Sequence, residues 1–322
     1  MKEIRISDID NITIGQVEDA KAGTGCTVFI CNEGMAAGLD VRGGGPASRE
    51  SELLKPLAAA NKIHAIMLAG GSAFGLDASG GVMHLLEENN IGFDVGVTKV
   101  PLVCQADLFD LAVGDSRIRP DKKMGYDAAQ IAIAGGNYQD GNYGAGCGAT
   151  VGKWNGMDTC MKSGIGSYAV QIGDLKIGAV IAVNALGDIY DWKTGKRIAG
   201  VLSADKKSFA STEELMLKNI ESVENKFTGN TTIGVVITNA YFNKSQLCKI
   251  AGMAQDGYAR SIRPVHTSTD GDSIYAVSVG SVPADIDVVG TLAAQVTSEA
   301  ILRAVNNCEA AFGFPSVSSM KL

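Results

Sequence analysis

Strand-forming segments follow one another along this chain with few helices between them, and this order constrains the fold more than any other feature. The strand candidates are residues 11–17, 26–31, 63–68, 165–172, 176–184, 188–191, 231–237 and 273–279. Apolar residues at helical spacing predict helices at 76–88, 243–258 and 284–311. A parallel, doubly wound sheet requires strands and helices in alternation. We therefore expect sheets that pack on each other and are covered by helices, with 165–191 forming a three-stranded meander.

Glycine is the unusual component of the composition. It supplies 40 of the 322 residues, above the usual share of about 7%, whereas proline supplies only 7. Because glycine has no Cβ atom, its clusters predict tight turns and close approaches between backbones. The pair Gly80-Gly81 lies inside the helix candidate 76–88, so we expect this helix to pack closely on a neighbouring element.

Charge and cysteine usage exclude several classes of protein. The net charge is −7 and no basic run occurs, which leaves no electrostatic footprint for nucleic acid or an anionic membrane. Seven scattered cysteines and three histidines predict neither a disulfide framework nor a zinc site. The N-terminal residues are charged and no apolar run approaches about 18 residues, so we expect no signal peptide and no membrane helix. These features predict a cytoplasmic protein with no metal and no cofactor.

Familiar catalytic and nucleotide-binding motifs fail on inspection. Residues 144–149 read G-x-G-x-x-A but lack a βαβ context, and Trp154 replaces the hydroxyl residue that a P-loop needs after Lys153. Ser72 lacks the correctly spaced second glycine of a hydrolase elbow. We interpret His64 and His84 as core residues, and His266 as a structural hydrogen-bond donor beside a turn.

The junction between Asn230 and Thr231 offers a different chemistry. The most polar long segment, 203–230, ends here and a β-branched strand begins. If the peptide bond before Thr231 were cut, this residue would carry both a hydroxyl nucleophile and a free α-amine, whose pKa of about 7.7–8.0 suits a general base. The plain alternative is that Thr231 and Thr232 are ordinary strand residues, and local composition alone favours that alternative.

The wider pattern resembles a known family. The segments that carry the resemblance are 38–50, 63–78, 144–153, 183–188 and 230–236. They run in order over nearly the whole chain and are similar to the DmpA-type (P1) aminopeptidase family, which includes β-peptidyl aminopeptidases and nylon-oligomer hydrolases. The resemblance implies an α+β fold, an αββα four-layer sandwich of the N-terminal-nucleophile-hydrolase type shared with ornithine acetyltransferases.

The resemblance also implies a processing scheme. Residues 1–322 would form a single catalytic domain that cuts itself between Asn230 and Thr231 into a large chain, 1–230, and a small chain, 231–322. The processed heterodimers would assemble into a homotetramer or a larger oligomer. The partner would be a small peptide or oligoamide substrate, with no nucleic acid and no membrane.

Five positions match the catalytic residues of the family. Thr231 takes the place of the nucleophile, Asn184 that of the oxyanion donor, and Lys153 that of a cation beside the α-amine. Asp270 and Asp272 take the place of the acidic pair, and their Asp-x-Asp pattern is closer to nylon-oligomer hydrolases than to the Ser-x-Glu of β-peptide enzymes.

Three further residues are expected to bind substrate, namely Phe109, Tyr143 and Ser268. Phe109 stands where the family has a tyrosine, which removes one hydroxyl contact. The expected activity is that of an aminopeptidase or of an endo-type hydrolase of 6-aminohexanoate oligomers, acting through a threonine acyl-enzyme. The rivals are an acyltransferase of the ornithine-acetyltransferase type and a non-catalytic ligand-binding protein.

Overall fold

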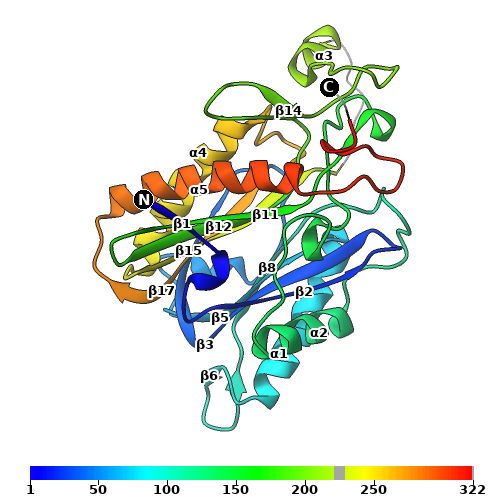
Figure 1. Ribbon diagram of the computed structural model, residues 1–322. Coiled ribbons are helices and arrows are strands. Elements are labelled where there is room, and N and C mark those ends of the chain that lie inside the picture. Colours follow the sequence, from blue (N-terminus) through cyan, green and yellow to red (C-terminus); the bar gives the residue numbers. More distant parts are fainter. Residues whose placement is uncertain (221–228, 321–322) are drawn as a thin grey trace.

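One long strand, β3 (Thr24–Val41), connects two layers of β-sheet in the computed structural model, which describes residues 1–220 and 229–320. Its first part pairs with β2 (Thr13–Asp19) and β5 (Ile63–Ala69), and its last part pairs with β17 (Ser273–Val282). The ladder of ten strands therefore folds over at β3 into two stacked layers (Figure 1).

The two layers have different strand directions. The first layer has the order β1 (Lys2–Ile4), β11 (Ile165–Ile172), β12 (Leu175–Asn184), β15 (Thr231–Ala240) and β17. The second layer continues from β3 through β5 and β8 (Val103–Asp107) to β4 (Ala47–Arg49), with β2 on the other side of β3. In this ladder only β15 with β17 and β5 with β8 run parallel, as far as residues 1–220 and 229–320 show.

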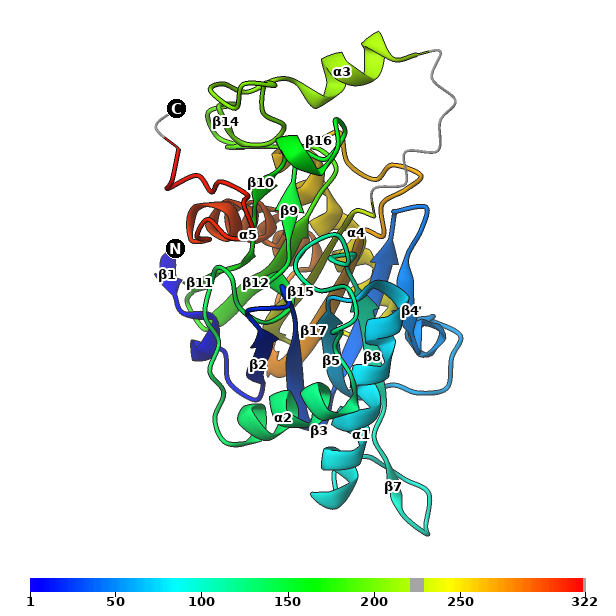
Figure 2. The same ribbon diagram turned by 90° about the vertical axis from the view of Figure 1, so that its right-hand side faces the viewer.

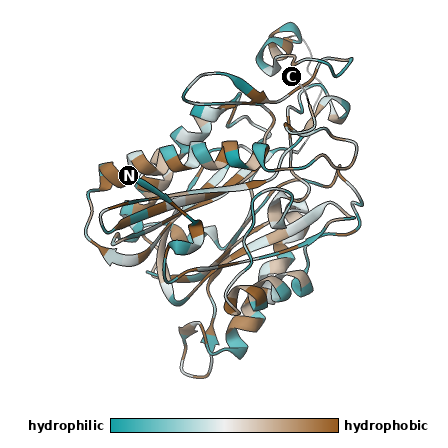
Figure 3. Ribbon diagram, in the orientation of Figure 1, coloured by the Kyte–Doolittle hydropathy of each residue, from teal (hydrophilic) through white to brown (hydrophobic). Residues whose placement is uncertain are grey.

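Helices cover both outer faces. α4 (Lys244–Ser261) and α5 (Ile286–Asn306) lie on the first layer, and α1 (Ala78–Glu88) and α2 (Lys122–Ile133) lie on the second (Figures 1 and 2). Brown and teal residues alternate along these helices in Figure 3, as expected for helices with one buried face. The arrangement is the predicted αββα sandwich.

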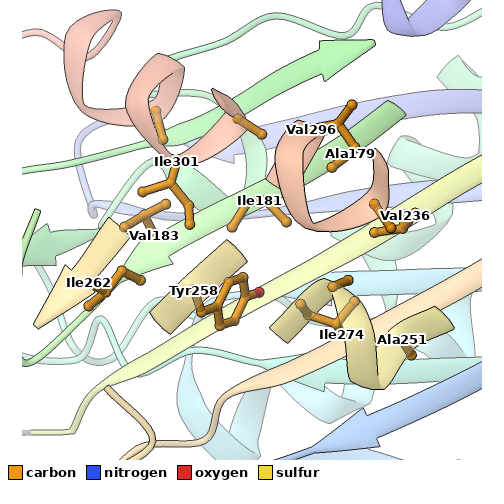
Figure 4. Close-up of a cluster of buried hydrophobic side chains, with 14 of the residues drawn as sticks. Ala179, Ile181, Val183, Val236, Ala251, Tyr258, Ile262, Ile274, Val296 and Ile301 are labelled. Carbon is orange, nitrogen blue, oxygen red and sulfur yellow. The ribbon is translucent and has the colours of Figure 1, made fainter. Parts of the chain in front are cut away.

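The strands divide their side chains between three apolar cores with a period of two. In β15, Ile233, Val235 and Ile237 point into the core between the two sheet layers, whereas Val236 points to α4 and α5 (Figure 4). A strand that is apolar on both faces can be buried only in the middle of such a stack. This explains why the β-branched run that begins at Thr231 forms a central strand.

The remaining elements are short. They are α3 (Thr212–Lys218), the strands β6 (Phe93–Asp94), β7 (Lys99–Val100), β9 (Thr150–Val151), β10 (Met161–Lys162), β13 (Asp188–Tyr190), β14 (Arg197–Ala199) and β16 (Ile262–Arg263), and the 3-10 helices Ile6–Asp8, Ser51–Leu54, Ser72–Asp77, Gly144–Gly146 and Met157–Thr159.

Two details differ from the sequence expectations. The third strand of the expected meander, β13, leaves the large sheet and pairs with β14 and β16 in a sheet of its own. α2 was not predicted, because its buried positions are small residues (Gly125, Ala128, Ala129 and Ala132) that give no pattern of large apolar side chains. Part of the polar segment 203–230 lies outside the described residues.

α5 is the helix that bears on the expectation of no membrane helix. Within the described part of the chain it is the one helix whose length and composition would allow it to span a bilayer, but 67% of its apolar window is buried inside the protein. Its side chains pack on β11 and β12 in the apolar core of the first layer. α5 is therefore a core helix.

Adjacent glycines in α1 give a matched test of this packing. A Cβ atom on Gly81 would lie 1.8 Å from the backbone oxygen of Lys122 in α2, whereas a Cβ on Gly80 would meet only the flexible side chain of Lys122, at 3.2 Å. Both changes to alanine gain the same helix propensity. We expect Gly81→Ala to lower the unfolding free energy by about 1–3 kcal/mol relative to Gly80→Ala. Urea unfolding measures the difference, and equal midpoints would contradict the close approach of α1 and α2.

Candidate active site

Two neighbouring strand ends bring the expected nucleophile and the expected oxyanion donor together. Thr231 is the first residue of β15 and Asn184 is the last residue of β12, and the two are directly opposite each other in the antiparallel pair. Both side chains are buried, with exposures of 4% and 0%. The sheet register therefore fixes their relative position.

Lys153 lies beside this pair and is also buried. Its Nζ donates hydrogen bonds to the backbone oxygen of Asn184 at 3.0 Å, to the side-chain oxygen of Asn184, and to the backbone oxygen of Gly229 at 3.3 Å. Burial lowers the pKa of Lys153 to about 7, although Asp270 and Asp110 are among the groups that oppose this shift. The amine can therefore lose or gain its proton near neutral pH.

The side-chain amide of Asn184 has a fixed orientation. The backbone N–H of Thr150 donates to its Oδ1 at 3.1 Å, and a backbone N–H can only donate. Its Nδ2 consequently faces the carbonyl oxygen of Phe109, to which it donates at 2.9 Å. The Nδ2 group carries a second hydrogen, which is available in principle for an oxyanion.

The segment Asp270-Gly271-Asp272 forms a turn beside Thr231. Asp272 accepts hydrogen bonds from the backbone N–H of Thr232 at 2.8 Å and from the backbone and ring nitrogens of His266 at 3.1 and 2.9 Å. Asp272 thus connects the turn to the strand that begins at Thr231.

Asp270, the other carboxylate of this turn, is held by Thr267. It accepts from the backbone N–H and from the hydroxyl of Thr267, both at 2.7 Å. Burial and the neighbouring Asp272 raise the pKa of Asp270 to about 6, while Thr267 and Lys153 oppose the shift. In the described part of the chain neither Asp270 nor Asp272 forms a direct ion pair with Lys153. The electrostatic attraction between each carboxylate and the lysine therefore acts over a longer distance.

The peptide that precedes Thr231 is tightly surrounded. The Thr231 hydroxyl contacts the carbonyl oxygen of Asn230, and the backbone N–H of Gly271 donates to the same oxygen at 3.2 Å. A Cβ atom on Gly271 would lie 2.5 Å from the Thr231 hydroxyl oxygen, so only glycine fits this position without displacement.

The three expected substrate contacts are placed differently. The ring of Phe109 covers Gly229, where a Cβ atom would lie 2.1 Å from a ring carbon. Ser268 is exposed and belongs to the same loop as Asp270. Tyr143 is 38% exposed, and no hydrogen bond or ring contact between described residues joins its side chain to Thr231. The structure therefore brings Phe109 to the site and places Ser268 in the loop that carries Asp270, but the described residues do not connect Tyr143 with the site.

The sequence interpretation missed Asp110. This buried carboxylate accepts from the hydroxyl of Thr24 and from the backbone N–H of Gly71, both at 2.7 Å, and burial raises its pKa to about 6. Its position one residue after Phe109 was the available signal, but its partners come from distant segments.

In the part that the structure describes, no group of three His, Cys, Asp or Glu side chains is arranged to hold a metal ion.

The histidines correct one expectation. His64 is buried and accepts a hydrogen bond from the backbone of Leu102, and His266 donates within the turn, both as predicted. His84 is not a core residue, because its side chain is 67% exposed and pairs with Glu88 on the surface of α1.

Comparison with known proteins identifies the family. The sequence profile of peptidase family S58 matches residues 5–317. The chain belongs to this family. It is 35% identical to an uncharacterized aminopeptidase of Mycobacterium leprae, over 98% of this chain and 93% of that protein. It is 28% identical to a 6-aminohexanoate-oligomer endohydrolase of Agromyces, over 94% of this chain and 86% of that protein.

A solved structure supports the fold of this S58 member. The l-aminopeptidase D-Ala-esterase/amidase of Ochrobactrum anthropi, described as a variant of the Ntn hydrolase fold, superposes with a TM-score of 0.65 at 17% identity, over 94% of this chain and 86% of that chain. The resemblance stated from the sequence motifs is confirmed, and the chain is a hydrolase of amide bonds.

The lowered pKa of Lys153 can be tested in the intact chain. We expect the ¹³Cε signal of Lys153 to titrate near pH 7. Burial lowers the pKa of Lys162 to about 8, so its signal should titrate near pH 8. The measurement uses lysine-labelled Thr231→Val, which lacks the hydroxyl, and Lys153→Met should remove only the lower transition. Lys123→Met, on the surface of α2, is the control that changes neither. A chain in which no lysine titrates below pH 9 would refute the effect of burial.

Proposed function

We propose that this S58 hydrolase is activated by cleavage between Asn230 and Thr231 and that Thr231 is then its N-terminal nucleophile. The observation that carries the proposal is the register that sets Asn184 opposite Thr231 at the ends of β12 and β15. A threonine at the start of a buried central strand, preceded by a carbonyl that its own hydroxyl contacts, suits self-cleavage and later N-terminal catalysis.

The chemistry proceeds in two stages. In self-cleavage the hydroxyl oxygen of Thr231 attacks the carbonyl carbon of Asn230, and the C–N bond breaks to free the α-amine and leave an ester. Water then hydrolyses the ester, which releases the carboxylate of Asn230 and the hydroxyl of Thr231. In turnover this amine acts as the general base for the same hydroxyl. The second N–H of the Asn184 side chain stabilises the oxyanion of the acyl-enzyme step.

Charged groups around the nucleophile tune both stages. Lys153 lies next to the position of the new α-amine, and in its protonated form it lowers the pKa of that amine. Asp272 orients the start of β15 through its bond to Thr232, and Asp270 supplies a carboxylate that exchanges its proton near pH 6. We assign the acid–base work of self-cleavage to Asp270 and Lys153.

The substrate is a peptide or linear oligoamide. The Asp-x-Asp pattern at 270–272 favours the endo-type hydrolysis of 6-aminohexanoate oligomers that gives the Agromyces relative its name, whereas the mycobacterial relative is named an aminopeptidase. Phe109 and Ser268 would contact the substrate beside Thr231, and Tyr143 would contact a more distant part of it. A panel of amino-acid p-nitroanilides and 6-aminohexanoate oligomers distinguishes the two activities.

Two rival functions have direct tests. An acyltransferase would form a condensed product when an acyl donor is mixed with an amine acceptor, whereas a hydrolase would release the acid. A ligand-binding protein would remain a single chain after prolonged incubation. We further propose a cytoplasmic homotetramer, or a larger oligomer, of processed heterodimers, which light scattering and cell fractionation would test.

Self-cleavage itself is the first prediction of this proposal. Denaturing mass spectrometry should find the fragments 1–230 and 231–322 in place of one 33.4 kDa chain, with threonine at the new N-terminus. Thr231→Ala should remain a single folded chain, because the strand accepts alanine but the nucleophile is gone. A cut at another bond, or no cut in any preparation, would remove Thr231 from its assigned role.

The acidic turn provides the second prediction. Because the pKa of Asp270 is raised to about 6, its carboxylate forms as the pH rises through 6, and the self-cleavage rate should rise over the same range. Asp270→Asn should abolish this dependence and slow self-cleavage and turnover on the order of 10²-fold or more. The double variant Asp270→Asn with Lys153→Met should be only slightly slower than the slower of the two single variants, because the two groups act as a unit.

The competing interpretation makes this segment only a turn. Asparagine serves a turn about as well as aspartate. A kcat of Asp270→Asn within about threefold of the wild type, with unchanged thermal stability, would return the residue to a structural role.

A further inference from the structure

The carbonyl oxygen of Asn230 accepts a hydrogen bond from a backbone N–H group. The backbone N–H of Gly271 donates to it at 3.2 Å, and Asn230 and Asp270 form a parallel β-bridge that aligns the two backbones. We propose that the backbone N–H of Gly271 is the oxyanion donor of self-cleavage. The inference rests on the proposed cut between Asn230 and Thr231.

The chemistry of the cut places the negative charge on this oxygen. When the Thr231 oxygen forms a bond to the carbonyl carbon of Asn230, the electron pair of the C=O bond moves to the oxygen that Gly271 already contacts. Collapse of this intermediate breaks the C–N bond, the nitrogen of Thr231 takes the proton lost by the hydroxyl, and an ester remains. A donor that is in place before the reaction stabilises this charge without reorganisation.

The side chain of Asn184 contacts other groups before the cut. Its Nδ2 donates to the carbonyl oxygen of Phe109, and its Oδ1 accepts from Thr150 and Lys153. The N–H of Gly271 already donates to the carbonyl oxygen of Asn230, whereas the Nδ2 of Asn184 donates to that of Phe109. We therefore assign a different donor to each stage. The backbone of Gly271 serves self-cleavage, and the amide of Asn184 serves the turnover that follows.

The turn that carries Gly271 is held from both sides. On one side a Cβ atom at Gly271 would lie 2.5 Å from the Thr231 hydroxyl oxygen, so the turn already touches the nucleophile. On the other side the backbone N–H groups of Arg42 and Gly45 donate to the carbonyl oxygens of Asp272 and Asp270, at 2.9 and 2.8 Å.

The loop behind the turn leaves it no room to recede. A Cβ atom at Gly43 would lie 2.3 Å from the backbone oxygen of Asp270 and 2.4 Å from the backbone nitrogen of Asp272. The glycine run 43–45 belongs to the family-like motif in the sequence. It packs against the turn and thus fixes the position of the Gly271 N–H. Gly43 is a positioning residue in this scheme, because it acts only through the turn.

Replacement of a single backbone group tests the donor. Incorporation of glycolic acid in place of Gly271, by suppression of a stop codon in cell-free synthesis, exchanges the N–H for an ester oxygen and adds no bulk. We expect self-cleavage to slow on the order of 10²-fold or more, the usual effect of removing one oxyanion donor. The matched control is the same exchange at Gly96, whose N–H donates a hydrogen bond to Asp94 on the exposed β6–β7 hairpin. A rate within about threefold of that control would overturn the proposal.

A second variant covers the case in which the ester does not fold. Gly43→Ala adds a Cβ atom that would lie 2.3 Å from the backbone oxygen of Asp270, so the turn must shift relative to Asn230 and self-cleavage should also slow. The change replaces none of Thr231, Asn184 and Lys153. In the uncleaved Thr231→Val chain, Asn230 precedes the only valine that follows an asparagine, so ¹³C′-Asn/¹⁵N-Val labelling yields a single HNCO signal. Gly43→Ala should move this carbonyl signal, because the shifted turn changes the hydrogen bond from the N–H of Gly271.

The outcomes separate this inference from the proposed function. A moved carbonyl signal together with a wild-type rate in Gly43→Ala would overturn the role of Gly271 alone. A wild-type chain that is never cut between Asn230 and Thr231 would instead end the proposed function.

Discussion

The antiparallel pairing of β12 with β15 is the interaction on which the site depends. A one-residue slip in this register would move every side chain of β15 to the opposite face of the sheet. The side chains that fill the core between the sheets would then point to the helices, and the reverse. Both faces of β15 are packed against apolar cores, so the register is fixed by the burial of Ile233, Val235 and Val236 rather than by Thr231 itself. The same register brings Asn184 and Thr231 face to face. Hydrophobic packing further along the strand thus positions the two candidate catalytic residues.

Close backbone contacts then complete the site around these strand ends. Three segments that are distant in the sequence meet here, namely the loop at 42–45, the turn at 270–272 and the residues preceding Thr231. Side chains would keep these backbones several ångströms apart, so glycine is required where they touch. This requirement explains much of the unusual glycine content near the site, and the contacts between α1 and α2 explain another part of it. A site built from backbone groups is rigid, which suits a reaction that needs donors in place before charge develops.

Burial also sets the electrostatics. Lys153, Asp110, Asp270 and Asp272 are all buried, and desolvation penalises a charged form whatever its sign. The pKa of the lysine is lowered to about 7 and those of Asp110 and Asp270 are raised to about 6, so these groups exchange protons within a narrow range near neutrality. Groups with pKa values close to the working pH are the effective acids and bases of catalysis. The same desolvation that costs stability therefore brings the pKa values of these groups into the range that the proposed proton transfers require.

The sequence by itself determined the layered α+β architecture and the central position of the strand at 231–237. It also proposed Thr231, Asn184 and Lys153 as site residues, and the structure brings these three together. Strand periodicity and motif order are properties of the sequence itself, so they can be recognised without knowing which segments pack together. Only the tertiary structure decided that β13 joins a separate sheet, that α2 forms through small residues, and that Asp110 lies near Lys153. It also revealed the N–H of Gly271 on the Asn230 carbonyl, because a backbone donor has no side chain for a sequence pattern to display. Contacts between segments far apart in the chain depend on packing, and packing is a property of the whole fold.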